Sequence, residues 1–177
     1  TVSVTGGKLT TYRVMADDVM QAVAPLLGIR HGASPTASRP LPGGDVGDVE
    51  TEIARVARDT ALPIASARRM VEAYGSRWTH LWASAQSMAG GTAQLVPGLP
   101  YLAAEAAYAA QHEMAVTIGD ILIRRTHIAF ETRDNGRSIA PRIAEIVAPI
   151  LGWSADHRRD EVVRCEAELD RMFRIDD

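Results

Sequence analysis

Amphipathic helical patterns run from residue 48 almost to the end of this chain, and they constrain its fold more than any other feature. Apolar residues recur there at three- and four-residue spacing, which buries one face of a helix. The alternation of apolar and polar residues that is typical of a half-buried strand occurs convincingly only at residues 2–4. We therefore predict an all-α fold, a helical bundle, with β structure confined to the extreme N-terminus.

Capping residues mark the ends of these predicted helices. Side-chain oxygens of Ser, Thr and Asp accept backbone N–H groups at helix starts, and glycine at a helix end adopts positive φ without strain. The N-cap candidates are Asp48, Ser76, Ser138 and Ser154, and the candidate terminators are Gly28, Gly75 and Gly152. Thr117 and Asp120 have the spacing of a capping box. Asp120 also stands four residues before Arg124, which favours a structural ion pair. A structural role is therefore preferred over a phosphate-binding role for Arg124 and Arg125.

A glycine turn follows the short strand pattern. Gly6 and Gly7 can bring the backbone close to a ligand, and Lys8 is the only lysine among nineteen basic residues. A helix is predicted to begin at Thr10 or Thr11, and a helix start after such a turn suits an anion. The Walker pattern of phosphate-binding loops is not met, because Val2 stands where its first glycine is required and Leu9 stands where its Ser or Thr is required. From these residues alone, an exposed turn and an anion-binding turn both remain open.

The composition changes after residue 28. Residues 29–47 contain three prolines and several glycines without an apolar period, which is typical of a linker. The predicted organisation is a strand, glycine turn and helix at 1–28, a linker at 29–47 and a helical domain at 48–177.

Composition and charge exclude several classes of protein. The net charge is −3, so no basic field attracts nucleic acid. A single cysteine, Cys165, rules out an internal disulfide framework and indicates a cytoplasmic setting. His112 and Glu113 begin the pattern H-E-x-x-H, but Val116 replaces the second histidine, so no metal site is expected.

Two separated motifs carry a family resemblance. The segment TGGKLTTYR at residues 5–13 resembles the end of the flavin-binding domain of FAD-dependent glycerol-3-phosphate dehydrogenases of the aerobic, respiratory type. PGLPYL at residues 97–102, HEMA at residues 112–115 and RRT at residues 124–126 resemble the helical C-terminal domain of the same family. The motifs occur in the right order over nearly the whole chain, which is more specific than either one alone.

The resemblance implies a set of site residues. FAD would be the cofactor, and the cofactor-binding residues would be Gly6, Gly7, Lys8, Leu9, Thr10 and Thr11. Lys8 would also bind the substrate phosphate, as an electrostatic group and not as a proton shuttle. The catalytic base and the main phosphate-binding arginines would lie upstream of this chain.

The resemblance also implies a function. The complete flavoprotein would oxidise sn-glycerol 3-phosphate to dihydroxyacetone phosphate and pass the electrons to a quinone, in the cytoplasm at the inner face of the membrane. This chain would be a C-terminal part, whose partners are the N-terminal flavin and substrate domains. It lacks the Rossmann pattern for the ADP half of FAD, so we expect it to be inactive alone. The alternative is a helical interaction module that forms a homodimer.

Overall fold

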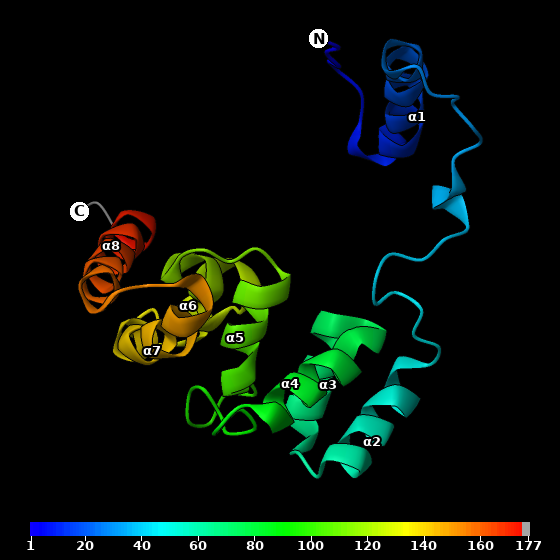
Figure 1. Ribbon diagram of the computed structural model, residues 1–177. Coiled ribbons are helices and arrows are strands. Elements are labelled where there is room, and N and C mark those ends of the chain that lie inside the picture. Colours follow the sequence, from blue (N-terminus) through cyan, green and yellow to red (C-terminus); the bar gives the residue numbers. More distant parts are fainter. Residues whose placement is uncertain (175–177) are drawn as a thin grey trace. The chain divides into compact units, whose positions relative to one another are not determined.

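The structure is a computed structural model that describes residues 1–174. The chain divides into two compact units, Thr1–Gly44 and Asp45–Asp177. Helices are the regular elements of both units, and the described residues show, besides helices, one isolated β-bridge between Gln94 and Leu102 (Figure 1). The predicted all-α class is therefore confirmed.

The first unit is built around helix α1 (Tyr12–Val23), which lies between the 3₁₀ turns Leu9–Thr11 and Ala24–Leu27. Gly28 ends this helical segment with φ of 65°, as predicted. The strand predicted at residues 2–4 is wrong, because residues 1–8 contain no regular element. A strand is stable only when a neighbouring strand pairs with its backbone groups, and the described residues of this chain supply no sheet.

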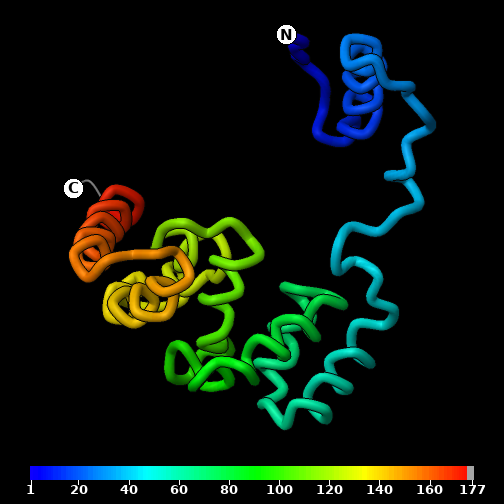
Figure 2. Tube along the Cα trace, in the orientation of Figure 1, coloured from blue at the N-terminus to red at the C-terminus, as the bar shows by residue number. Residues whose placement is uncertain are grey.

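The second unit holds the remaining α-helices and a π-helix (Figures 1 and 2). They are α2 (Val49–Thr60), α3 (Ile64–Tyr74), α4 (Trp78–Ser87), α5 (Ala103–His112), a π-helix (Asp120–Arg125), α6 (Ile128–Glu131), α7 (Ala140–Leu151) and α8 (Ala155–Phe173). Helix α2 packs on α3, α5 packs on both α4 and α7, and α7 packs on α8.

Helix α5 contributes side chains to two hydrophobic clusters. Leu102, Ala104 and Tyr108 pack with the buried faces of α2, α3 and α4. Ala103 and Ala106 pack instead with the π-helix, α7 and α8. Alanine side chains on both faces allow close approach from two sides, and the whole segment 103–109 is buried. The central position of α5 therefore follows from its alanine-rich sequence.

Several predicted helix ends are confirmed. The carboxylate of Asp48 accepts the N–H of Thr51 at 2.7 Å, and the hydroxyl of Ser154 accepts the N–H of His157 at 3.1 Å. Gly75 and Gly152 follow the last residues of α3 and α7.

Two predicted N-caps are wrong. Ser76 lies inside the 3₁₀ turn Gly75–Arg77, and its hydroxyl hydrogen-bonds to Asp45. Ser138 lies inside the 3₁₀ turn Arg137–Ile139, where its N–H donates to Asp134 at 2.8 Å. In both places a tighter turn precedes the α-helix, so the helix begins later than the serine indicates.

Candidate functional site

The predicted cofactor-binding residues form a glycine turn followed by the start of a helix. Gly6 and Gly7 have φ of 82° and 90°, a region that favours glycine. A Cβ on Gly7 would collide with the sulfur of Met15, whereas a Cβ on Gly6 would meet nothing within 4 Å. Gly7 therefore closes the turn against α1, and Gly6 leaves an open backbone surface.

Lys8 lies between this turn and the helix. Its backbone is extended, and its carbonyl accepts the N–H and the hydroxyl of Thr11 at 2.9 and 2.8 Å. Thr11 thus donates its hydroxyl to the turn instead of capping the helix. Lys8, Leu9 and Thr10 are exposed, and the Lys8 ammonium makes no hydrogen bond or ion pair with the residues that the structure describes. The segment presents a free cation beside the N-terminal end of a helix.

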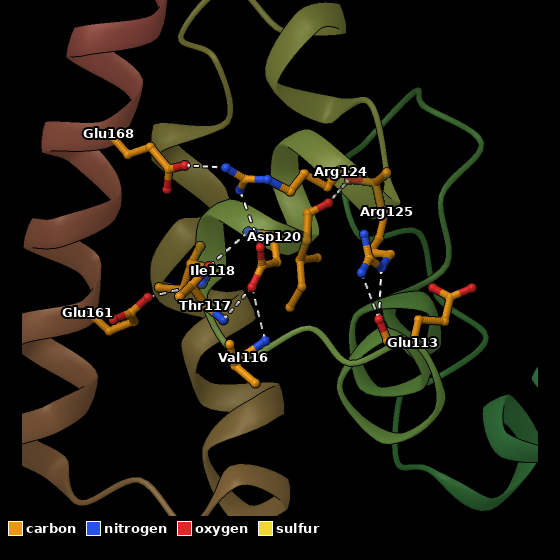
Figure 3. A network of polar contacts seen from close by, with 11 residues as sticks. Glu113, Val116, Thr117, Ile118, Asp120, Arg124, Arg125, Glu161 and Glu168 are labelled. Atoms are coloured by element: carbon orange, nitrogen blue, oxygen red, sulfur yellow. Dashed lines mark hydrogen bonds and ion pairs between the residues drawn. The ribbon is translucent and has the colours of Figure 1, made fainter. Parts of the chain in front are cut away.

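A second polar constellation surrounds the π-helix of the other unit (Figure 3). One carboxylate oxygen of Asp120 accepts the N–H groups of Val116 and Thr117, each at 3.1 Å. The hydroxyl oxygen of Thr117 in turn accepts the N–H of Asp120 at 3.0 Å. The predicted capping box is therefore present. Arg124 bridges Asp120 at 3.3 Å and Glu168 of α8 at 2.8 Å, so the predicted ion pair is confirmed and extended.

Arg125 connects the π-helix to the end of α5. Its Nε and one terminal nitrogen both donate to the carbonyl of Glu113, at 3.0 and 2.8 Å (Figure 3). Burial raises the pKa of the Glu113 carboxyl, and the charge of Arg125 opposes that rise. This arginine holds a backbone group, which agrees with the structural role preferred from the sequence.

A buried carboxylate lies on helix α5, which contributes side chains to both hydrophobic clusters. Glu105 of α5 is fully buried. It accepts the N–H of Leu102 at 2.9 Å, the hydroxyl of Tyr74 at 2.9 Å and the Nε of Arg69 at 3.2 Å. Arg69 also donates to the carbonyl of Arg125 at 3.0 Å. The network ties α3, α5 and the π-helix together.

Only a weak sequence signal could have located this network. Glutamate at the third position of a helix is typical of a capping box, and Glu105 fills that place in α5. The burial of its partner Arg69 comes from tertiary packing, which local spacing does not encode. Its contacts are internal, so the network supports the fold and not a ligand.

The part of the chain that the structure describes contains no group of three or more His, Cys, Asp or Glu residues arranged to hold a metal ion. Among the same residues, no helix is both long and apolar enough to cross a membrane.

Comparisons with known proteins give the family. A family model described as the C-terminal domain of alpha-glycerophosphate oxidase matches residues 34–158, more than half of the chain. This chain belongs to that family. This match, together with the glycerol-3-phosphate dehydrogenases described next, confirms the predicted relationship to the C-terminal part of that enzyme family.

Curated relatives of this chain match it over nearly its whole length. Glycerol-3-phosphate dehydrogenase 2 of Mycobacterium tuberculosis is 35% identical over 181 residues, 99% of this chain and 31% of that protein. The mitochondrial glycerol-3-phosphate dehydrogenase of Mus musculus is 31% identical over 91% of this chain and 22% of its own length. The chain therefore spans under a third of these relatives.

A solved structure shares the fold. The X-ray structure of the glycerol-3-phosphate dehydrogenase from Bacillus halodurans, complexed with FAD, matches 97% of this chain and 36% of its own length. The TM-score is 0.74 and the sequence identity is 24%. This likeness supports the helical architecture described above.

Proposed function

We propose that the complete protein containing this chain is an FAD-dependent dehydrogenase that oxidises sn-glycerol 3-phosphate to dihydroxyacetone phosphate. The observation that carries the proposal is the 35% identity, over 99% of this chain, to a glycerol-3-phosphate dehydrogenase. A quinone would accept the electrons, at the inner face of the cytoplasmic membrane. The chain itself would be the C-terminal domain, with its partners in the flavin and substrate domains.

The glycine turn supports a role at the flavin. FAD, when bound, supplies the acceptor for the hydride that leaves the substrate carbon. The open backbone at Gly6 allows a planar group to approach without a Cβ in the way. The start of α1 offers N–H groups and the positive end of a helix dipole to negative charge that develops there. Gly6, Gly7, Lys8, Leu9, Thr10 and Thr11 are the residues we assign to the cofactor.

Lys8 is the residue we assign to the substrate phosphate. An exposed ammonium without a partner among the described residues is available to an anion, and a compact charge suits a phosphate group. Its contribution would be electrostatic, the attraction of an ammonium for an anion. It would hold the phosphate and orient the reacting carbon, and proton transfer would fall to residues outside this chain.

The test uses the complete protein. Anaerobic addition of sn-glycerol 3-phosphate should bleach the flavin absorbance, and a soluble quinone should restore it. Lys8→Met should lower kcat/KM, measured per bound FAD, about a hundredfold with the fold intact, and Lys8→Arg, which keeps the charge, should lose less. Failure of the substrate to reduce the flavin would refute the proposed activity, and unchanged kinetics in Lys8→Met would refute the assignment of Lys8.

This chain alone should bind no FAD and have no dehydrogenase activity, because it lacks the dinucleotide-binding pattern G-x-G-x-x-G. Stoichiometric flavin absorbance in the purified chain would contradict this expectation.

Self-association is the alternative role, and exposed apolar side chains in the first unit favour it. Leu9 is 90% exposed and Tyr12 is 55% exposed, and apolar patches of this kind often mark contact surfaces. The chain should form a homodimer that weakens when Val19 and Val23 are made polar. Sedimentation that shows a monomer at high concentration, unaffected by those changes, would exclude this role.

A further inference from the structure

The loop between α5 and the π-helix exposes two apolar side chains. We name residues 113–117 the Met114 loop. Met114 is 86% exposed and Val116 is 62% exposed, whereas Ala115 between them is fully buried. The loop therefore inserts its central residue into the core and presents the apolar residues on either side to the surroundings.

Hydrogen bonds hold this loop in one conformation (Figure 3). At its start, the carbonyl of Glu113 accepts two bonds from Arg125. In its middle, the N–H of Ala115 donates to the carbonyl of Ala109 at 3.0 Å. At its end, Asp120 accepts the N–H groups of Val116 and Thr117. A loop fixed in this way loses little conformational entropy when it binds a partner.

The backbone of Met114 is strained. Its φ is 57°, a left-handed conformation that is uncommon for a bulky residue other than glycine. Such strain persists only where the surrounding structure enforces it, and it is frequent at contact and functional sites. Here it directs a long, flexible thioether side chain outward, where it makes no contribution to the core of this chain.

Polar side chains hold the residues on either side of the exposed methionine. Arg125 donates two hydrogen bonds to the carbonyl of Glu113, and Asp120 accepts the N–H of Val116. Methionine and arginine are enriched at the centres of protein interfaces, and a polar rim is typical around them. The chemistry of the Met114 loop is therefore that of a small protein-docking surface.

We propose that the Met114 loop is a contact through which this domain docks onto the rest of the same polypeptide, the part that lies outside the segment matched by this chain. The inference rests on the proposed function, in which this chain is one domain of a larger enzyme. The chain spans 31% of the length of its mycobacterial relative, so most of that protein lies outside the matched segment.

The size of the surface favours a partner on the same polypeptide. A stable complex between separate chains buries on the order of 800 Å² on each partner, more than two side chains supply. A covalently linked domain needs less, because the linker keeps its effective concentration near the millimolar range. The Met114 loop is thus suited to an intramolecular contact.

Oxidation of methionine measures this contact directly. Hydrogen peroxide converts exposed thioethers to sulfoxides, and mass spectrometry of peptides gives the rate at each position. Met114 should react rapidly in the 177-residue chain and about tenfold more slowly in the complete protein. Met70, which is fully buried, should be protected in both, and Met172, which is 50% exposed, gives the rate of an exposed site in the isolated chain. Equal rates at Met114 in the two proteins would overturn the proposal.

Met114→Gly separates docking from a merely structural role. Glycine adopts positive φ without strain, so the variant should raise the melting temperature of the isolated chain by a few degrees. In the complete protein the same change removes the anchor, so hydrogen exchange across residues 113–117 should become about as fast as in the isolated chain. Met172→Gly, on the exposed face of α8, should not increase exchange at the loop. If Met114→Gly leaves the loop protected in the complete protein, the side chain is not the anchor.

The remaining outcomes identify other partners or other failures. Protection of Met114 that increases with the concentration of the isolated chain would indicate a second copy, and protection that requires anionic phospholipid vesicles would indicate a membrane. Either result would overturn the proposed partner. A complete protein that protects Met114 but whose flavin is not reduced by sn-glycerol 3-phosphate would refute the proposed function and leave the docking contact standing. Flavin reduction without protection of Met114 would refute the docking contact alone.

Discussion

At the scale of single residues, the buried pair Arg69 and Glu105 contributes to stability through its partners on α3, α5 and the π-helix. Removing one partner of a buried ion pair leaves an uncompensated charge and typically costs about 3–5 kcal/mol. We expect Arg69→Met to lower the free energy of unfolding by an amount in that range, measured by urea titration of this chain. Arg68→Met is the matched control, because Arg68 pairs with Glu50 on the exposed surface, where an ion pair contributes about 1 kcal/mol or less.

The same variant gives a prediction for pH. Burial raises the pKa of Glu105, and Arg69 opposes that rise. Without Arg69 the pKa of the folded state increases further above that of the unfolded state. The folded state then binds the extra proton, so its stability falls as pH rises between the two pKa values. The deficit of Arg69→Met relative to Arg68→Met should therefore shrink when the pH is lowered from 8 to 5. A deficit that is constant over this range would mean that the loss of Arg69 does not change the protonation of Glu105.

At the scale of elements, the capping box of the π-helix can be separated from its ion pair. Asp120→Ala removes the acceptor for two backbone N–H groups, which should cost about 1–2 kcal/mol of stability. Arg124→Met removes only half-exposed ion pairs with Asp120 and Glu168 and should cost less than about 1 kcal/mol. Asp120→Asn, which keeps a side-chain oxygen, should restore most of the stability in thermal melts. Equal losses in Asp120→Ala and Arg124→Met would assign the stabilisation to the ion pair.

Elements were predictable from the sequence where local chemistry determines them. Asp48, Ser154 and the Thr117–Asp120 box satisfy N–H groups within four residues, so their spacing alone identified them. The π-helix was not predictable, because Ile118, Ile121 and Leu122 also fit an α-helical period. The strand at residues 2–4 failed for a related reason: its alternation is local, but a strand depends on partners elsewhere.

Candidate sites were likewise predictable only where neighbouring residues determine their structure. The glycine turn was identified because Gly6 and Gly7 are adjacent to a helix start, and both do adopt positive φ. The Met114 loop was not, since its bonds from Arg125 depend on how α5 and the π-helix meet. A turn can be recognised from consecutive residues in the sequence, whereas a loop held by tertiary contacts can be recognised only once the fold is known.

At the scale of the whole molecule, the second unit contains both hydrophobic clusters, so its helices should unfold together. The segment that joins it to α1 is exposed from Arg30 to Pro42 and contains little regular structure, and such segments are the first to be cut by proteases. Brief trypsin treatment should therefore cleave first after Arg30 or in the preceding exposed turn at Lys8, and arginines within α2 and α8 should resist. The large product should then melt in a single transition, with the same midpoint by circular dichroism and by tryptophan fluorescence, because Trp78 lies in one cluster and Trp153 packs on the other. Two separate midpoints would show that α5 does not couple the clusters, in spite of contributing buried side chains to both.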